Sequence, residues 1–183
     1  MKHKLSIFVI LIFILTSSFS VGYNWAQAWV DDATITKSNL SKPILSQVTE
    51  KHLTLIVLTK KYLIKTASNG NTYLHCYLVN GTDTTTSIGR ADATITGFST
   101  EILKDSIWQQ FQLPINSDCG NSYWTQKLKI KTALSIRLDH NEIGPIRVPF
   151  RIRFDHNNNV IYSNIITVDI DQKNYDRVGN SKK

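Results

Sequence analysis

Cysteine, proline and glycine are all scarce in this sequence, which has two, four and eight of them in 183 residues. It also lacks the patterns that accompany common catalytic and metal sites. There is no G-x-S-x-G elbow and no papain-like cysteine context, and no histidines at H-x-H or H-x-x-x-H spacing. These absences argue against nucleophilic catalysis and against a zinc site. We therefore predict a protein that is not an enzyme and that carries no cofactor or metal.

Charge is missing from the N-terminal stretch between Lys4 and Asp31. A short basic head precedes an apolar run over residues 5–15, and a more polar stretch leads to Ala26-Gln27-Ala28. This is the pattern of a secretory signal, whose peptidase accepts only small side chains at the first and third positions before the cut. The pattern predicts a signal peptide over residues 1–28, cleavage after Ala28, and a secreted or periplasmic protein.

An uncleaved membrane anchor over residues 5–22 is the alternative, in which Trp25 and Trp29 would lie at the membrane interface. Polar residues dilute the second half of this segment, whereas a spanning helix needs about 20 apolar residues. Lipid anchoring would need a cysteine directly after the cut, and the first cysteine is Cys76. Release is therefore favoured, and contact with a membrane is expected only if the segment is retained.

The remaining chain is long enough for one domain with a modest core. We predict a polar lead-in segment over residues 29–51, a β-rich domain over 52–172 and a flexible polar tail over 173–183. Without Lys2 and Lys4, 19 basic residues stand against 14 acidic ones, which gives a formal charge of +5. A charge of this size suits solubility and by itself identifies no ligand.

From residue 52 onward, short runs rich in β-branched and aromatic residues alternate with turn formers, which indicates eight or nine strands in an all-β sandwich or barrel. The run 72–79 has two apolar faces, so we expect a central strand. The run 147–154 alternates most cleanly, but Pro149 favours an edge position for it. A hairpin loop is expected over residues 155–159.

Three segments resemble parts of bacterial immunoglobulin-like domains of exported proteins. These are Tyr77-Leu78-Val79-Asn80-Gly81-Thr82-Asp83, Lys104-Asp105-Ser106-Ile107-Trp108-Gln109-Gln110-Phe111, and Phe150-Arg151-Ile152-Arg153-Phe154 ahead of Tyr162-Ser163-Asn164. The resemblance covers residues 72–170 and implies an immunoglobulin-like antiparallel β-sandwich. The family's turn glycine is replaced here by Ser106, and the Cys-Trp-Cys spacing of antibody domains is absent. A sandwich of this kind hosts many tasks, so the resemblance implies a fold and no activity.

Cys76 and Cys119 form an even pair that an oxidising compartment would allow to bond. Cys76 lies in an apolar strand pattern and Cys119 in a turn-rich loop. A disulfide therefore requires that the fold bring these two segments together.

Several clusters are candidates for binding. Basic residues on two predicted strands suggest an anion-binding face, the alternative being charges that protect sheet edges from pairing. The members of this face are Lys127, Lys129, Lys131, Arg147, Arg151 and Arg153. No aromatic alternates with them along their own strands, which argues against a nucleic-acid partner.

Aromatic residues could instead form a platform for a carbohydrate or a protein, or serve as core and strand-end packing. The candidates for this platform are Trp108, Tyr123, Trp124 and Tyr162. Two Asp-His steps, 139–140 and 155–156, would suit a metal only if they met at one end of the domain.

The sequence as a whole predicts an exported binding or structural module that meets a protein or glycan partner. The alternatives are an inhibitor or accessory domain that acts on a secreted hydrolase, and a membrane-anchored extracytoplasmic domain.

Overall fold

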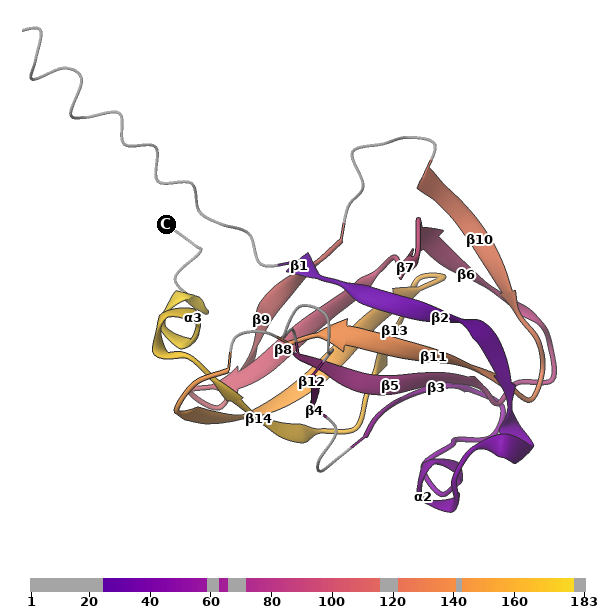
Figure 1. Ribbon diagram of the computed structural model, residues 1–183, viewed down its shortest axis with the longest axis horizontal. Coiled ribbons are helices and arrows are strands. Elements are labelled where there is room, and N and C mark those ends of the chain that lie inside the picture. The colour runs from indigo at the N-terminus through magenta and orange to yellow at the C-terminus, as the bar shows by residue number, and fades with distance from the viewer. Residues whose placement is uncertain (1–24, 59–62, 66–71, 116–121, 141–142, 180–183) are drawn as a thin grey trace, which may run out of the picture.

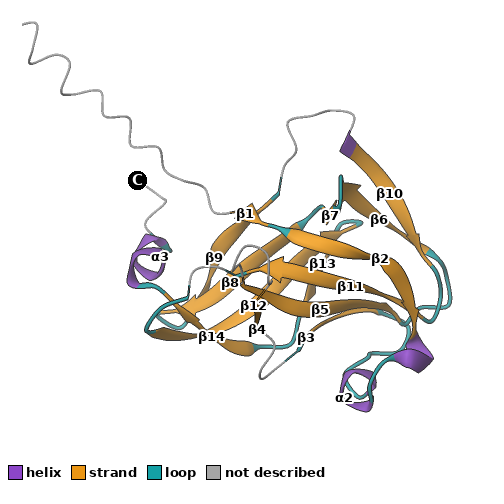
Figure 2. Ribbon diagram, in the orientation of Figure 1, coloured by secondary structure: helices purple, strands orange, loops and turns teal. Residues whose placement is uncertain are grey.

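The computed structural model describes residues 25–58, 63–65, 72–115, 122–140 and 143–179. These residues form two β-sheets packed face to face as a sandwich (Figure 1). Strands make up most of the structure, and the few helical turns lie at its periphery (Figure 2). The prediction of an all-β sandwich is confirmed at this level. The predicted signal helix lies outside the described residues.

The first sheet has six strands in the order β1-β9-β8-β12-β13, with β14 also paired to β12. Its strands are β1 (Trp25–Ala26), β8 (Phe98–Lys104), β9 (Ile107–Pro114), β12 (Ile146–His156), β13 (Asn159–Tyr162) and β14 (Ile166–Ile170). Apart from the parallel pairing of β1 with β9, its ladders are antiparallel.

The second sheet has eight strands in the order β10-β6-β7-β2-β11-β5-β3, with β4 also paired to β5. Its strands are β2 (Ala28–Thr36), β3 (Leu53–Val57), β4 (Leu63–Lys65), β5 (Thr72–Asn80), β6 (Thr86–Ala91), β7 (Thr94–Ile95), β10 (Tyr123–Leu128) and β11 (Thr132–Asp139). β5 pairs with β11 on one side and with β3 and β4 on the other, so its predicted central position is confirmed.

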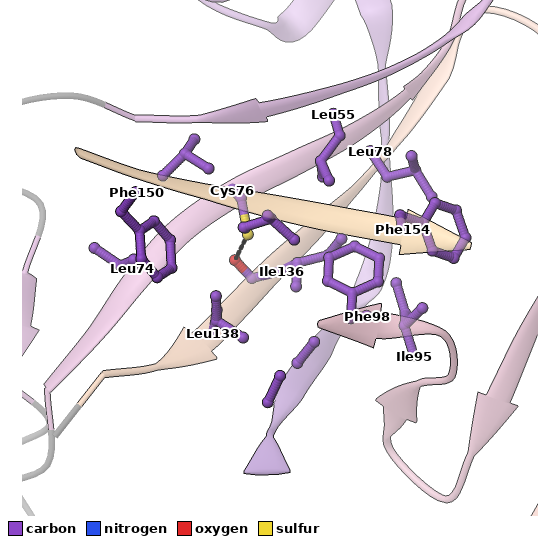
Figure 3. Packing of buried hydrophobic residues seen from close by; sticks show 14 of the residues in the cluster. Leu55, Leu74, Cys76, Leu78, Ile95, Phe98, Ile136, Leu138, Phe150 and Phe154 are labelled. Atoms are coloured by element: carbon purple, nitrogen blue, oxygen red, sulfur yellow. Dashed lines mark hydrogen bonds between the residues drawn. The ribbon is translucent and has the colours of Figure 1, made fainter. Parts of the chain in front are cut away.

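The core lies between the two sheets and follows from period-two alternation on the strands. β5 contributes Leu74, Cys76 and Leu78, while β12 contributes Phe150 and Phe154 from the opposite sheet (Figure 3). All of these side chains are at most 4% exposed. The burial of this apolar area is the main source of the domain's stability.

Two tight hairpin turns join strands of the first sheet. Asp105 and Ser106, between β8 and β9, both have positive φ, and so do Asn157 and Asn158, between β12 and β13. Two successive positive φ values produce the turn whose twist matches that of paired strands. The hairpin predicted over residues 155–159 is therefore confirmed.

The predicted lead-in segment is wrong in its first part, because residues 28–36 form β2. This strand lies inside the second sheet, where it pairs with β11 on one side and β7 on the other. Ala28 and Val30 of this strand belong to the main core, whereas Thr34 and Thr36 are exposed. A short 3-10 turn, Lys37–Asn39, and α2 (Lys42–Leu45) follow it. Leu40 and Ile44 then pack on the outer face of the second sheet in a small separate cluster.

The predicted flexible tail is also corrected, because its first part forms α3 (Gln172–Arg177). The Asp171 side chain caps this helix by accepting a hydrogen bond from the backbone N–H of Asn174 at 2.7 Å. Val178 directly after it is 4% exposed and belongs to the main core. Lys104 Nζ donates to the carbonyls of Tyr175 and Val178, at 2.8 Å each. One buried valine and these bonds therefore hold a polar segment in place.

The edge position predicted for the strand containing Pro149 is wrong as well. β12 lies between β8 on one side and β13 and β14 on the other. The ladder with β8 runs from Phe150 to Phe154, so Pro149 lies just beyond its end. A proline is tolerated here because no β8 partner is present at its position.

Among the described residues, no helix has the length and apolar character needed to cross a membrane.

Candidate functional site

A compact cluster on the outer face of the first sheet joins four strands. Glu101 of β8 and Arg151 of β12 are direct cross-strand partners, and Arg151 Nη2 lies 2.6 Å from Glu101 Oε2. The Arg151 guanidinium carbon lies 4.2 Å from the ring centre of Trp108 on β9 and 3.9 Å from that of Tyr162 on β13. We call these four residues the Arg151 stack.

The ion pair of the Arg151 stack is more sheltered from solvent than a typical surface ion pair. The Arg151 and Glu101 side chains are only 18% and 11% exposed, and Arg151 Nε also donates to Glu101 at 2.7 Å. Two contacts to one carboxylate oxygen fix the plane of the guanidinium, which suits it to stacking on aromatic rings. Tyr162 remains 43% exposed, so one end of the stack faces solvent.

The other two arginines of the predicted anion-binding face are paired with carboxylates too. Arg147 lies 3.4 Å from Asp169, and Arg153 lies 3.0 Å from Asp155. Each arginine of β12 therefore has an acidic partner, and the stripe carries little net charge. Asp155 lies on β12 itself, but arginine alternation along that strand does not reveal Glu101 on β8 or Asp169 on β14.

The lysines of that predicted face lie in the other sheet. Lys127 is on β10 and donates to the Ser87 hydroxyl at 2.7 Å, while Lys129 and Lys131 belong to the turn before β11. The structure therefore separates the three lysines from the three arginines. None of the four ion pairs within the described ranges involves a lysine.

A shallow groove of about 490 Å³ lies beside one of these lysines, Lys131. Lys37 and Lys131 line it together with the apolar side chains of Leu45 and Ile130. Its lining includes no carboxylate. We call Lys127, Lys129 and Lys131, together with Lys37 from the groove, the lysine end. This surface is more positive than the arginine stripe, because each arginine of the stripe has an acidic partner.

The predicted aromatic platform divides between the two sheets. Trp108 and Tyr162 are brought together by Arg151, whereas Tyr123 and Trp124 lie on β10, where both are exposed. Trp124 has its own partners, because its indole donates to the Asp92 carbonyl at 3.0 Å and the Arg90 guanidinium lies 4.9 Å from its ring centre. The sequence indicated all four aromatic residues, but it could not show that the two pairs lie on different sheets.

A second polar cluster, missed from the sequence, crosses the outer face of the second sheet. Ser135 Oγ of β11 donates to Asp31 Oδ2 of β2 at 2.6 Å, and it lies 2.8 Å from His75 Nε2 of β5. Arg137 forms an ion pair with the same Asp31 at 3.0 Å. Burial lowers the pKa of His75 below its ordinary value, against the opposing effect of Asp31.

The proton order in this cluster differs from that of a catalytic serine. A hydroxyl has one proton, and Ser135 gives it to Asp31, so His75 Nε2 must act as the donor toward Ser135. Nucleophilic catalysis needs the reverse, in which the imidazole accepts the serine proton and the carboxylate orients the imidazole. We therefore interpret these residues as a hydrogen-bonded surface network that joins three strands.

The two Asp-His steps do not meet. His140 is fully buried against Phe150, with ring centres 6.1 Å apart. Its backbone carbonyl accepts a hydrogen bond from the Thr72 hydroxyl. His156 instead stacks on Phe154 and bonds to Thr86 at 3.1 Å. Within the described parts of the chain, no three His, Cys, Asp or Glu side chains are grouped so as to hold a metal ion.

Cys76 is a free thiol in this structure. It is fully buried between the sheets, and its Sγ lies 3.5 Å from the carbonyl of Ile136 (Figure 3). Burial raises the pKa of this thiol, so it stays protonated and unreactive. The disulfide predicted with Cys119 is therefore not formed here, and Cys119 itself lies outside the described residues.

The two alanines of the predicted cleavage site lie on strands, Ala26 at the end of β1 and Ala28 at the start of β2. Ala26 and Ala28 are both 0% exposed and belong to the main core. Ala28 pairs with Leu138 in the β2–β11 ladder, and Ala26 pairs with Pro114 of β9. Two small residues at alternate positions are also what a strand places against a crowded core.

Comparison of the chain with protein-family models, with curated proteins and with solved structures gives no match in any of the three.

Proposed function

We propose that this chain is an exported, non-enzymatic binding module that meets a protein partner through the Arg151 stack. The single observation that carries the proposal is the pair of aromatic rings that lie against one arginine. Tryptophan, tyrosine and arginine are the residues that most often dominate binding energy at protein interfaces. A partner that covers Tyr162 would gain a ring whose position is already fixed.

The surroundings of the stack favour a protein over a polyanion. Arg147 lies beside Asp169 of the neighbouring strand β14, and Arg153 lies beside Asp155 of its own strand. A surface with interspersed charges of both signs selects a partner with the complementary pattern and repels like-charged surfaces. Val160, which is 44% exposed and lies on the same strand as Tyr162, adds an apolar contact.

An immunoglobulin-like topology is part of the same proposal. It is supported by the residues that resemble such domains, by the tight hairpin at Asp105 and Ser106, and by the parallel pairing of β1 with β9. Export is supported by the basic head and apolar run of residues 1–15. Sandwich domains of this class often act by recognition, and the fold alone identifies no partner.

Site-specific photo-crosslinking tests the proposal. A photoreactive phenylalanine analogue replaces Tyr162 in the full chain, which is produced in its native host and irradiated in intact cells. The matched control carries the same analogue at Thr34, an exposed position on the other sheet. We expect one discrete, protease-sensitive adduct at position 162 and none at position 34.

Arg151→Lys provides the second comparison, because lysine keeps the charge but loses the planar stacking group. In the crosslinking strain this change should weaken the adduct at least about tenfold, equivalent to about 1.4 kcal/mol. An adduct removed by glycosidase and not by protease would replace the protein partner with a glycan. Equal adducts at positions 162 and 34, or no adduct at 162, would contradict the proposed surface.

A further inference from the structure

We propose that the lysine end docks on a membrane surface of anionic lipids, with the Ile130 side chain entering the interface between the lysines. This surface belongs to the second sheet and the turns beside it, whereas the Arg151 stack lies on the first sheet. The inference therefore does not depend on the protein partner proposed above. It rests on one exposed apolar side chain, on the charges around it and on the contacts that hold its turn.

Ile130 lies in the turn between β10 and β11, and hydrogen bonds tie this turn to two neighbouring segments. The backbone N–H of Lys131 donates to the carbonyl of Asn80, the last residue of β5, at 3.2 Å. The carbonyl of Lys131 accepts from the backbone N–H of Lys37, in the 3-10 turn, at 2.7 Å. The turn lies at the end of the molecule opposite α3 (Figure 1). Ile130 is thus presented from a turn that is held on both sides.

The apolar part of this surface consists of Ile130 and the groove beside it. The Ile130 side chain is 46% exposed, and Leu45 of α2, which is half-buried, lines the groove with it. A single exposed isoleucine is ordinary on a protein surface. Here it lies next to a second apolar side chain and between two lysines of the same turn. Such a patch can enter the boundary between headgroups and acyl chains.

The charge around Ile130 is positive and is not neutralised by neighbouring carboxylates. Lys129 and Lys131 flank it in the chain, and Lys37 lines the same groove. Asp83 lies on the turn that follows β5, but it does not line the groove. Among the described residues, every ion pair uses an arginine and none uses a lysine. Each unpaired lysine near an anionic membrane adds to the attraction.

The combination of apolar and basic side chains favours a lipid surface over a soluble polyanion. A soluble acidic glycan would contact the lysine amines and leave Ile130 in water. At a membrane the amines reach the headgroups, while the aliphatic stems of Lys129 and Lys131 and the side chain of Ile130 leave water together. Anionic lipid is therefore the partner that uses the whole surface.

The first test is sedimentation of the exported protein with lipid vesicles. We expect binding to vesicles of mixed phosphatidylglycerol and phosphatidylcholine, weakening as salt rises, and little binding to phosphatidylcholine alone. A retained apolar N-terminal segment would bind both vesicles alike, so their comparison isolates the lysine end. The double variant Lys129→Gln, Lys131→Gln should bind the anionic vesicles at least about tenfold more weakly. Arg147→Gln, Arg153→Gln is the matched control and should change binding less than about twofold.

The second test separates insertion of Ile130 from attraction of charge alone. Ile130→Asn should weaken binding to the anionic vesicles about fivefold, yet elute from heparin resin at the wild-type salt concentration, which also shows that the variant is folded. Ile143→Asn is the control, because Ile143 is 48% exposed and its neighbour Gly144 packs against Asp171 at the start of α3.

Three results would overturn the proposal. The first is no binding to anionic vesicles, and the second is equal losses from Ile130→Asn and Ile143→Asn. The third is full vesicle binding by Ile130→Asn, which would leave a polyanion-binding surface and no membrane insertion. None of these results changes the crosslinking expected at Tyr162, so the two proposals fail separately.

Discussion

Arg151 and Glu101 face each other directly across β12 and β8, and their side chains are the least exposed of the ion pairs described here, at 18% and 11%. Two aromatic rings cover the guanidinium of this pair. A charge pair so sheltered from water depends strongly on both partners, because either charge left alone would be poorly hydrated.

Removing the carboxylate should therefore destabilise the domain. We expect Glu101→Gln to lower the free energy of unfolding by about 3 kcal/mol, since Arg151 keeps its charge and loses its partner. Asp169→Asn is the matched control, because its pair with Arg147 is largely exposed and contributes less than about 1 kcal/mol. Urea unfolding followed by tryptophan fluorescence measures both. Equal losses would show that the stack does not shelter the pair.

The lysine end should carry the binding of polyanions, whereas the arginine stripe should contribute little. We expect the double variant Lys129→Gln, Lys131→Gln to elute from heparin resin at clearly lower salt than the wild type. Arg147→Gln, Arg153→Gln removes the same number of charges, yet each arginine lies beside an acidic partner. Its elution should shift by less than half as much. The opposite order would restore the arginines as the anion-binding surface.

Two histidines should make the domain less stable in acid. Burial lowers the pKa of both His75 and His156 from the ordinary value of 6.5. The unfolded chain therefore binds protons more readily than the folded one as pH falls through 6.5 toward the folded-state values, and stability is lost over that window. Urea midpoints at pH 7.5 and pH 5 measure the loss. We expect His75→Gln and His156→Gln each to reduce it, and an unchanged loss in both would exclude these groups as its cause.

Cys76 should be protected from thiol reagents by the fold. In a Cys119→Ser variant, which leaves Cys76 as the single cysteine, a disulfide reagent should react slowly with the native protein and at least about a hundredfold faster in denaturant. The physical reason is that the thiol is fully buried and protonated. Rapid reaction of the native protein would place Cys76 at an accessible position, which the present core does not allow.

The strands were largely predictable because alternation and turn residues are local signals. The runs at 72–79 and 147–154 correspond to β5 and β12. Asn157 and Asn158 adopt the positive φ values that a tight hairpin needs. The sequence also indicated a sandwich, because these runs are short and regularly spaced.

What the sequence could not predict were relations between strands. The partner of Arg151 lies 50 residues away in the chain, and the ring of Tyr162 comes from a third strand. The separation of the lysines from the arginines depends on which sheet each strand joins. Segments with few apolar residues were misjudged for the same reason, since β2 and α3 are held by a few buried side chains such as Val30 and Val178.

The place of β2 also determines when the domain can fold. Its neighbour β11 pairs Ile136 with Val30, so the two strands lie more than a hundred residues apart in the chain. The first strand of the second sheet to leave the ribosome must therefore wait for one of the last. Pairing over such a long separation is slow, because the intervening loop must close before any contact forms. We expect the chain to remain unfolded through most of its synthesis, and an unfolded chain can be threaded through a narrow secretion channel.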